Sequence, residues 1–156
     1  MASISAITEL AEKYHQATEE FLNLAHSLQE SDLDKSDQED WTPRQVIHHM
    51  ADSEAQSFSR LRRLIAEPGS TIQGYDEAKW AETSTLGYNE LPVNNSLEII
   101  AAVRRSSYQV LTRLTAEQLE IFGNHTESGR YTIAKWIETY SRHPIDHANQ
   151  IRNQIK

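Results

Sequence analysis

The sequence predicts an all-α fold, a four-helix bundle that forms a single domain over residues 1–156. Apolar residues recur at alternating steps of three and four over long stretches, which is typical of amphipathic helices. Residues that favour helix starts and stops stand at the ends of these stretches, and only five glycines and four prolines interrupt the chain. No alternating run is long enough to predict a strand. We therefore expect four long antiparallel helices.

The first helix is expected from about Ile4 to Leu28, where apolar residues form one continuous stripe. An acidic loop over residues 31–40 follows. The members of the stripe are Ile7, Leu10, Tyr14, Ala17, Phe21, Leu24 and Leu28.

The second helix is expected to begin after Thr42, which can form a capping box with Gln45, and Pro43 suits the first turn. It should end at Pro68 and Gly69, which are strong stop signals.

A long loop over residues 70–95 joins the second and third helices and carries Tyr75, Trp80 and Tyr88. It should contain a short helix near residues 76–82. Because a loop of this length in a small domain is usually functional or tightly packed, we expect it to cover the mouth of the site described below. The alternative is that Trp80 simply plugs the bundle.

The third helix should start at Asn95 or Ser96 and end near Leu114. A capping box of Thr115 and Gln118 predicts a brief extra turn. Residues 123–129 are expected to form a loop, and the fourth helix should run from near Thr132 almost to the last residue.

Composition and charge narrow the functional classes. The formal net charge is −8, from 23 acidic and 15 basic residues, so nucleic acid is not an expected partner. The chain has no cysteine, which excludes disulfides, thiolate metal ligands and a cysteine nucleophile. No secretion signal or membrane-spanning stretch is apparent, so we expect a cytoplasmic protein without a membrane partner.

Two of the seven histidines lie on the apolar stripe of the last helix. His143 and His147 are one turn apart, so their imidazoles can bind a single metal ion from one inward face. Alternatively, both are hydrogen-bonded core residues. The rest of the stripe comprises Ile133, Trp136, Ile137, Tyr140, Ile151 and Ile155.

A third histidine borders a polar notch on the second helix. Ser53, Glu54 and Ser57 interrupt the apolar face, and buried polar groups need partners. His49 lies on the side of this notch, whereas His48 points nearly away and is expected at the surface or its boundary. Three neutral histidines would leave an open coordination position, where a metal can activate water or a thiol. A di-iron carboxylate site is not expected, because the chain has one Glu-x-x-His element and it lies off the apolar stripe.

Three stretches resemble the signatures of the DinB/YfiT-like family of metal-dependent enzymes. They are Trp41-Thr-Pro-Arg-Gln-Val-Ile-His-His-Met-Ala-Asp-Ser53, the loop Thr71-Ile-Gln-Gly-Tyr-Asp-Glu-Ala-Lys-Trp80 and Tyr140-Ser-Arg-His-Pro-Ile-Asp-His147. The resemblance implies a four-helix bundle with a nickel or zinc site formed by His49, His143 and His147. It also implies transfer of low-molecular-weight thiols such as bacillithiol, or mycothiol- or glutathione-dependent isomerisation, while many members carry only the label of hydrolase. A homodimer is plausible for the family.

The sequence departs from its close relatives around the last ligands. Arg142, Asp146 and Gln150 stand where relatives have tryptophan or further histidines, and Pro144 stands where glycine is common. These changes leave the three ligands intact. Because Pro144 lacks a backbone donor, we expect a kink between the two ligands of the last helix.

Two enzymatic functions follow from these residues. The first is thiol transfer, in which a metal ion, zinc or nickel, activates a thiol cosubstrate that attacks an electrophilic small molecule. The second is hydrolysis by metal-bound hydroxide, with Glu54 or Asp146 as proton acceptor. Glu54 could instead orient a ligand imidazole, and Asp52 is interpreted as a surface residue.

A non-enzymatic alternative is a helical module with a structural metal. A closed fourth coordination position would favour that alternative, and an open one would favour an enzyme.

Overall fold

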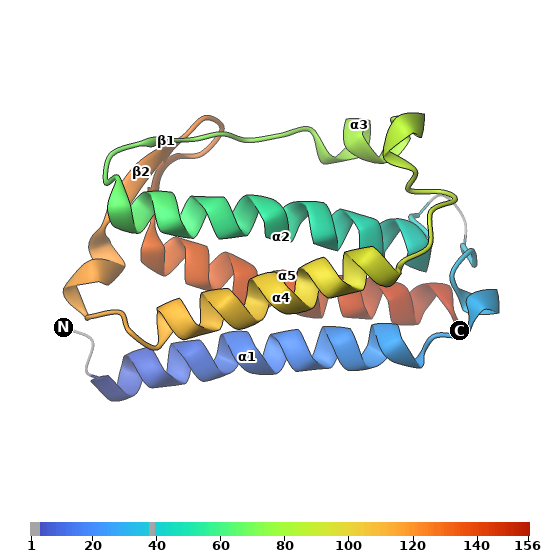
Figure 1. The fold of residues 1–156 in the computed structure, drawn as a ribbon, viewed down its shortest axis with the longest axis horizontal. Coiled ribbons are helices and arrows are strands. Elements are labelled where there is room, and N and C mark those ends of the chain that lie inside the picture. The colour runs from blue at the N-terminus through green and yellow to red at the C-terminus, as the bar shows by residue number, and fades with distance from the viewer. Residues whose placement is uncertain (1–3, 38–39) are drawn as a thin grey trace.

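Four long helices form the body of the protein in the computed structural model, which describes residues 4–37 and 40–156 (Figure 1). They are α1 (Ile4–Ser27), α2 (Pro43–Ala66), α4 (Asn94–Leu111) and α5 (Ile133–Gln154). The predicted helical bundle is confirmed. Two residues of the predicted acidic loop, 38 and 39, lie outside the described residues.

The directions of the helices differ from the simple antiparallel arrangement that we predicted. Helix α1 packs against α4 and α5, and α2 packs against the same two helices. Figure 1 shows that α2 and α4 run in the same direction, as do α1 and α5. The reason is the long connection after α2, which returns the chain to the end where α2 began. Only the pairs α1 with α4 and α2 with α5 are therefore antiparallel neighbours.

The helix starts follow the predicted capping chemistry. The Thr42 hydroxyl accepts a hydrogen bond from the Gln45 backbone N–H at 3.2 Å, and the Gln45 side chain accepts one from the Thr42 N–H at 2.9 Å. At the start of α5, the Thr132 hydroxyl accepts from the Lys135 N–H at 3.0 Å. These caps satisfy backbone donors that the first turn of a helix leaves without partners.

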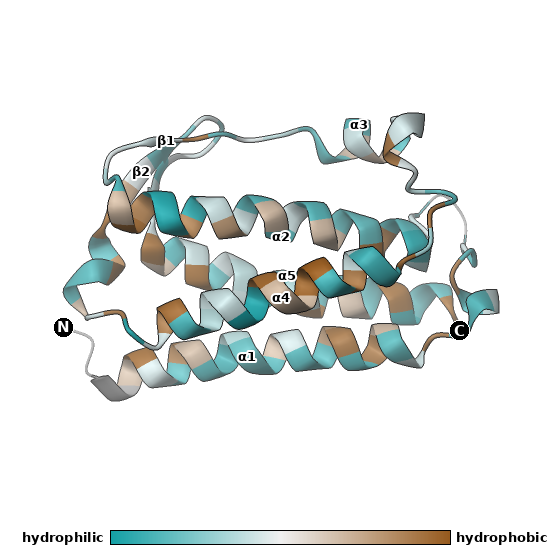
Figure 2. Ribbon diagram, in the orientation of Figure 1, coloured by the Kyte–Doolittle hydropathy of each residue, from teal (hydrophilic) through white to brown (hydrophobic). Residues whose placement is uncertain are grey.

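Apolar side chains fill the bundle in two clusters along its length. Figure 2 shows hydrophobic and hydrophilic residues alternating along each long helix, as expected of amphipathic helices. One cluster surrounds Tyr14, Trp136 and Tyr140, and the other surrounds Phe21 and Met50. Both clusters draw on α1, α2, α4 and α5, so the helices that carry the candidate ligands are held by apolar packing on either side of them.

A small sheet lies at one end of the bundle, where we predicted no strand. Strands β1 (Thr71–Ile72), β2 (Phe122–His125) and β3 (Gly129–Thr132) pair in the order β1-β2-β3, with β1 parallel to β2 and β2 antiparallel to β3. The predicted loop at residues 123–129 is thus largely a hairpin. Strands of two to four residues are too short to produce a periodic sequence signal. The sheet is peripheral, so the helical bundle remains the core of the fold.

The long connection between α2 and α4 contains two short helices, α3 (Glu77–Glu82) as predicted and a 3-10 turn, η2 (Ser84–Leu86). The side chain of Asp76 caps α3 by accepting from the Lys79 N–H at 3.0 Å. After α4, the short 3-10 helix η3 (Glu117–Glu120) occupies the place of the predicted extra turn. None of the described helices is both long enough and apolar enough to cross a membrane.

Candidate metal centre

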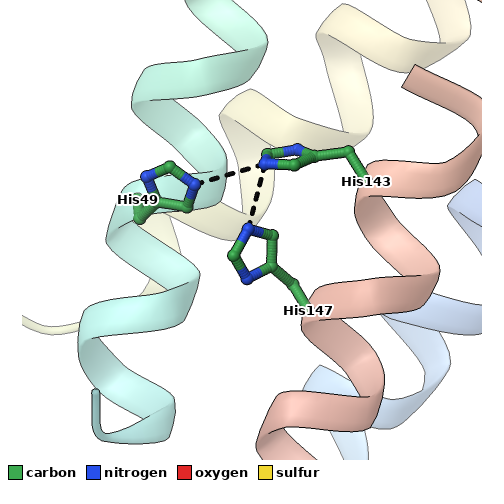
Figure 3. Close-up of side chains that lie close together, drawn as sticks. All are labelled: His49, His143 and His147. Carbon is green, nitrogen blue, oxygen red and sulfur yellow. Dashed lines mark hydrogen bonds between the residues drawn. The ribbon is translucent and has the colours of Figure 1, made fainter. Parts of the chain in front are cut away.

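Three histidines converge between α2 and α5 (Figure 3). His49 comes from α2, while His143 and His147 come from successive turns of α5. The Nε2 atom of His143 lies 3.3 Å from Nε2 of His49 and 2.9 Å from Nε2 of His147. One possible ligand atom from each residue lies within 4.8 Å of the others. The structure thus brings together the three residues that the sequence analysis selected.

The two short nitrogen distances, from His143 to His49 and from His143 to His147, are those expected of ligands that share a first-row metal ion. Imidazole nitrogens bind zinc at about 2.0–2.1 Å, which places two ligands of one ion about 3–3.5 Å apart at bond angles between a right angle and a tetrahedral one. Direct hydrogen bonding explains the group less well. A neutral imidazole nitrogen carries either one hydrogen or one lone pair, so His143 Nε2 cannot make a good hydrogen bond to both neighbours at once.

Burial keeps all three imidazoles neutral, which is the form that binds metal. It lowers the pKa of His49 to about 3, with a smaller contribution from the nearby His147. The pKa of His143 is held well below its usual value, first by burial and then by His147 and His49. Burial also lowers the pKa of His147, against the opposing effect of its hydrogen bond to Gln150. No proton therefore has to leave these rings at neutral pH before a metal binds.

The ring of His147 is oriented by a hydrogen-bonded chain. Its Nδ1 lies 2.7 Å from Oε1 of Gln150, and the Gln150 amide donates to Oδ1 of Asp40 at 2.7 Å. Because Gln150 Oε1 can only accept, Nδ1 of His147 carries the hydrogen and Nε2 turns its lone pair toward the other two rings. Gln150, one of the departures from the family pattern, therefore has a defined role beside a candidate ligand.

The other two rings are held by packing. Trp41 packs against His49 with ring centroids 5.0 Å apart, and Tyr140 lies 6.3 Å from His143. The Nδ1 atoms of His49 and His143 are buried and have no hydrogen-bond partner among the described residues. Over residues 4–37 and 40–156, no fourth histidine or carboxylate joins the group. An ion bound here would keep a position for a ligand that the described chain does not supply.

The structure places the two candidate proton acceptors elsewhere. Glu54 is fully buried and accepts hydrogen bonds from Arg104 Nη1 at 2.6 Å and from the Ser57 hydroxyl at 2.8 Å. Asp146 lies at the surface, with a carboxylate oxygen 3.6 Å from Nε of Arg142. Neither carboxylate belongs to the group formed by the three histidines.

Arg104, on α4, was missed in the sequence analysis. It is fully buried and completes the polar notch that includes Glu54 and Ser57. The notch was interpreted as a sign of the metal site, but its buried partner is this arginine. A sequence signal was present, because Ile100, Arg104 and Ser107 follow the three-and-four spacing of an inward face and all three are buried.

His48 and Asp52 also differ from their predicted surface positions. His48 is buried, with Nδ1 2.8 Å from the Ser96 hydroxyl and Nε2 3.0 Å from the Leu91 carbonyl oxygen. Asp52 is half-buried and accepts a 2.5 Å hydrogen bond from Tyr88. A cavity of about 330 Å³ adjoins His48, Asp52 and Tyr88. The cavity lies between α2, the end of the long connection and the start of α4. None of the three candidate metal ligands lines it.

One part of the long loop lies on the same side of α2 as His49. The Tyr75 hydroxyl is buried, and its neighbour Ser53 is one turn after His49 on α2. Burial raises the pKa of this hydroxyl. Trp80 is half-buried and packs on Tyr75, with ring centroids 4.6 Å apart. The loop is therefore not confined to the opposite end of α2, and its predicted role as a cover over the site remains a prediction.

Curated relatives share substantial sequence with this chain. A protein of Oceanobacillus iheyensis named "putative metal-dependent hydrolase" is 39% identical over 116 residues, which cover 74% of this chain and 66% of that protein. A protein of Bacillus mycoides with the same description is 33% identical over 161 aligned positions, which cover 97% of this chain and 91% of the relative.

A solved structure and a family model extend the comparison. YfiT from Bacillus subtilis, described as a probable metal-dependent hydrolase with an unusual four-helix bundle topology, superposes with a TM-score of 0.83 over 98% of this chain and 89% of YfiT. The sequences are 23% identical, so this likeness shows the shared fold. The model of the DinB superfamily matches residues 13–151. With this match and the curated relatives, the chain belongs to the DinB superfamily.

Proposed function

We propose that the protein is a metal-dependent enzyme in which His49, His143 and His147 hold one divalent ion, zinc or nickel, for catalysis. The observation that carries this proposal is the convergence of three neutral imidazoles without a fourth protein ligand among the described residues. A divalent ion at such a site acts as a Lewis acid and lowers the pKa of a thiol or water that binds beside the histidines.

The chain's own residues prepare the site for that role. The Gln150 side chain holds His147 in the tautomer that offers Nε2, and Asp40 holds Gln150. Trp41 packs on His49 and limits how far its ring can turn. Orientation of this kind raises the affinity of a site, because less rotational freedom is lost when the ion binds.

The first candidate reaction is transfer of a low-molecular-weight thiol to an electrophilic small molecule. Glu54 is paired with Arg104 and Asp146 is at the surface, so neither of the proposed bases belongs to the group that the histidines form. A thiol has an ordinary pKa of about 8.5 and loses its proton near a cation far more readily than water does. Since the chain has no cysteine, the thiol would be a cosubstrate.

The second candidate reaction is hydrolysis. It is favoured by the descriptions of the relatives from Oceanobacillus iheyensis and Bacillus mycoides as metal-dependent hydrolases. Because neither proposed carboxylate belongs to the group of histidines, this reaction would depend chiefly on the lowered pKa of the bound water, as three-histidine zinc sites allow.

The metal content of the purified protein tests the proposed ligands. We expect about one zinc or nickel ion per chain, measured by elemental analysis after purification, and a strong loss of it in His49→Ala. His48→Ala is the matched control, because both ring nitrogens of His48 are engaged by Ser96 and Leu91. If His48→Ala lost the metal and His49→Ala kept it, the ligand assignment would be wrong.

Activity assays then separate the two reactions. The metal-loaded protein is incubated with chlorodinitrobenzene and a panel of small thiols, and separately with nitrophenyl esters without thiol. Thiol-dependent conjugation that is lost in His49→Ala supports transfer, whereas thiol-independent ester cleavage supports hydrolysis. A metal-loaded protein inactive in both assays over a broad substrate panel would favour the structural-metal alternative.

A further inference from the structure

A proline interrupts the hydrogen bonding of α5 between its two candidate ligands. In an α-helix the carbonyl of residue 140 normally accepts from the N–H of residue 144. Residue 144 is Pro144, which has no N–H and whose ring crowds that carbonyl. The Tyr140 carbonyl is therefore denied its regular helical partner, one turn before His143 and within the buried part of the bundle.

The buried Arg104 supplies the missing donor from another helix. Its Nη2 donates to the Tyr140 carbonyl at 2.9 Å. The same guanidinium donates from Nη1 to Glu54 on α2 at 2.6 Å and from Nε to the Thr18 hydroxyl on α1 at 2.6 Å. Arg104 itself belongs to α4, so one planar group joins all four long helices.

We propose that Arg104 is a positioning residue for the metal centre, because its hydrogen bond to Tyr140 holds α5 where Pro144 interrupts the helical hydrogen bonding between His143 and His147. This inference rests on the proposed metal site. His143 precedes the proline and His147 follows it, so the backbone conformation at Pro144 affects how the two rings are placed relative to each other. The Glu54 contact ties the same guanidinium to α2 five residues after His49, which sets the distance between the two ligand-bearing helices.

This role requires the several N–H donors that a guanidinium group holds in one plane. Arginine presents five N–H donors in one rigid plane, whereas the lysine ammonium is a point charge on a flexible stem. Arg104→Lys can keep the charge that faces Glu54 but cannot reach Tyr140, Thr18 and Glu54 together. This variant therefore removes the positioning contact without leaving the buried carboxylate of Glu54 unpaired.

A double-mutant cycle between Arg104 and Pro144 tests the proposal. Pro144→Ala returns an N–H to residue 144, so the Tyr140 carbonyl regains its helical partner and this part of α5 no longer depends on Arg104. The readout is the dissociation constant of Co²⁺, titrated by its visible absorption into folded, metal-free protein. We expect Arg104→Lys alone to weaken Co²⁺ binding about tenfold, comparable to loss of a contact that orients a ligand. In the Pro144→Ala background, the same substitution should weaken it less than threefold.

The control is Thr18→Val, which removes one of the two hydrogen bonds from Arg104 to α1, a helix that carries no candidate ligand, and leaves the one to the Tyr14 carbonyl. It should lower the urea midpoint of unfolding but leave the Co²⁺ affinity within twofold of the wild type. Equal losses of affinity for Arg104→Lys in both backgrounds, or no loss in either, would overturn the positioning role while leaving the metal site itself intact. Absence of Co²⁺ binding in the wild type would overturn the proposed metal site, and with it this inference.

Discussion

Acid should destabilise the metal-free protein through its buried histidines, and His49 allows the size of the effect to be worked out. Its ordinary pKa of 6.5 falls to about 3 in the folded protein, where its side chain is 1% exposed. Below pH 6.5 the unfolded chain therefore binds a proton that the folded chain does not. The contribution of His49 to stability is complete above pH 6.5 and is lost progressively as the pH falls toward 3. At pH 5 the loss amounts to about 2 kcal/mol, from 1.36 kcal/mol per pKa unit.

Urea unfolding with a chelator present, at pH 7.5 and pH 5.0, measures this loss. His49→Gln removes the titrating group while keeping a polar side chain, so the decrease in the free energy of unfolding between the two pH values should be smaller by about 2 kcal/mol than in the wild type. His26→Gln is the control, because His26 is exposed on α1 and should not alter the decrease. An unchanged decrease in His49→Gln would refute the argument that burial of His49 makes folding sensitive to acid.

Three further predictions concern the same part of the molecule. Gln150→Ala should weaken zinc binding about 10- to 100-fold in a competition titration, because His147 loses the group that fixes its tautomer. Glu54→Leu should lower the free energy of unfolding by about 3–5 kcal/mol in urea, because the buried Arg104 is left without its carboxylate. Saturating zinc at 100 times its dissociation constant should raise the free energy of unfolding by about 2.7 kcal/mol, and His49→Ala should remove that gain.

The long helices could be predicted because their signals repeat over many residues. On α1, the apolar stripe through Ile7, Tyr14 and Phe21 is buried as expected. The hairpin at residues 122–132 could not be predicted in this way. Its strands are four residues each, and β1 contributes two more from a distant part of the chain. The pairing of Thr71 with Asn124 joins segments that are far apart in the sequence, so no local pattern of residues can predict it.

The directions of the helices also could not be predicted from the spacing of apolar residues. An amphipathic stripe shows which face of a helix is buried but is the same for a helix that runs up or down. The connection over residues 70–95 decides the direction of α4, and a loop long enough to span the bundle permits either outcome. Its length was therefore a sign that the neighbours α2 and α4 could run in parallel.

The polar notch on α2 led to the choice of His49, but the interpretation of the notch itself was incomplete. His49 lies beside the notch, but Glu54 and Ser57 face Arg104 rather than the three rings. The two groups are nevertheless connected, because Arg104 also holds the carbonyl of Tyr140, one turn before His143. A buried ion pair is costly to form and adds little to stability over an apolar core. Its hydrogen bonds to both ligand-bearing helices indicate a different benefit, the fixed placement of α2 relative to α5 that three converging imidazoles require.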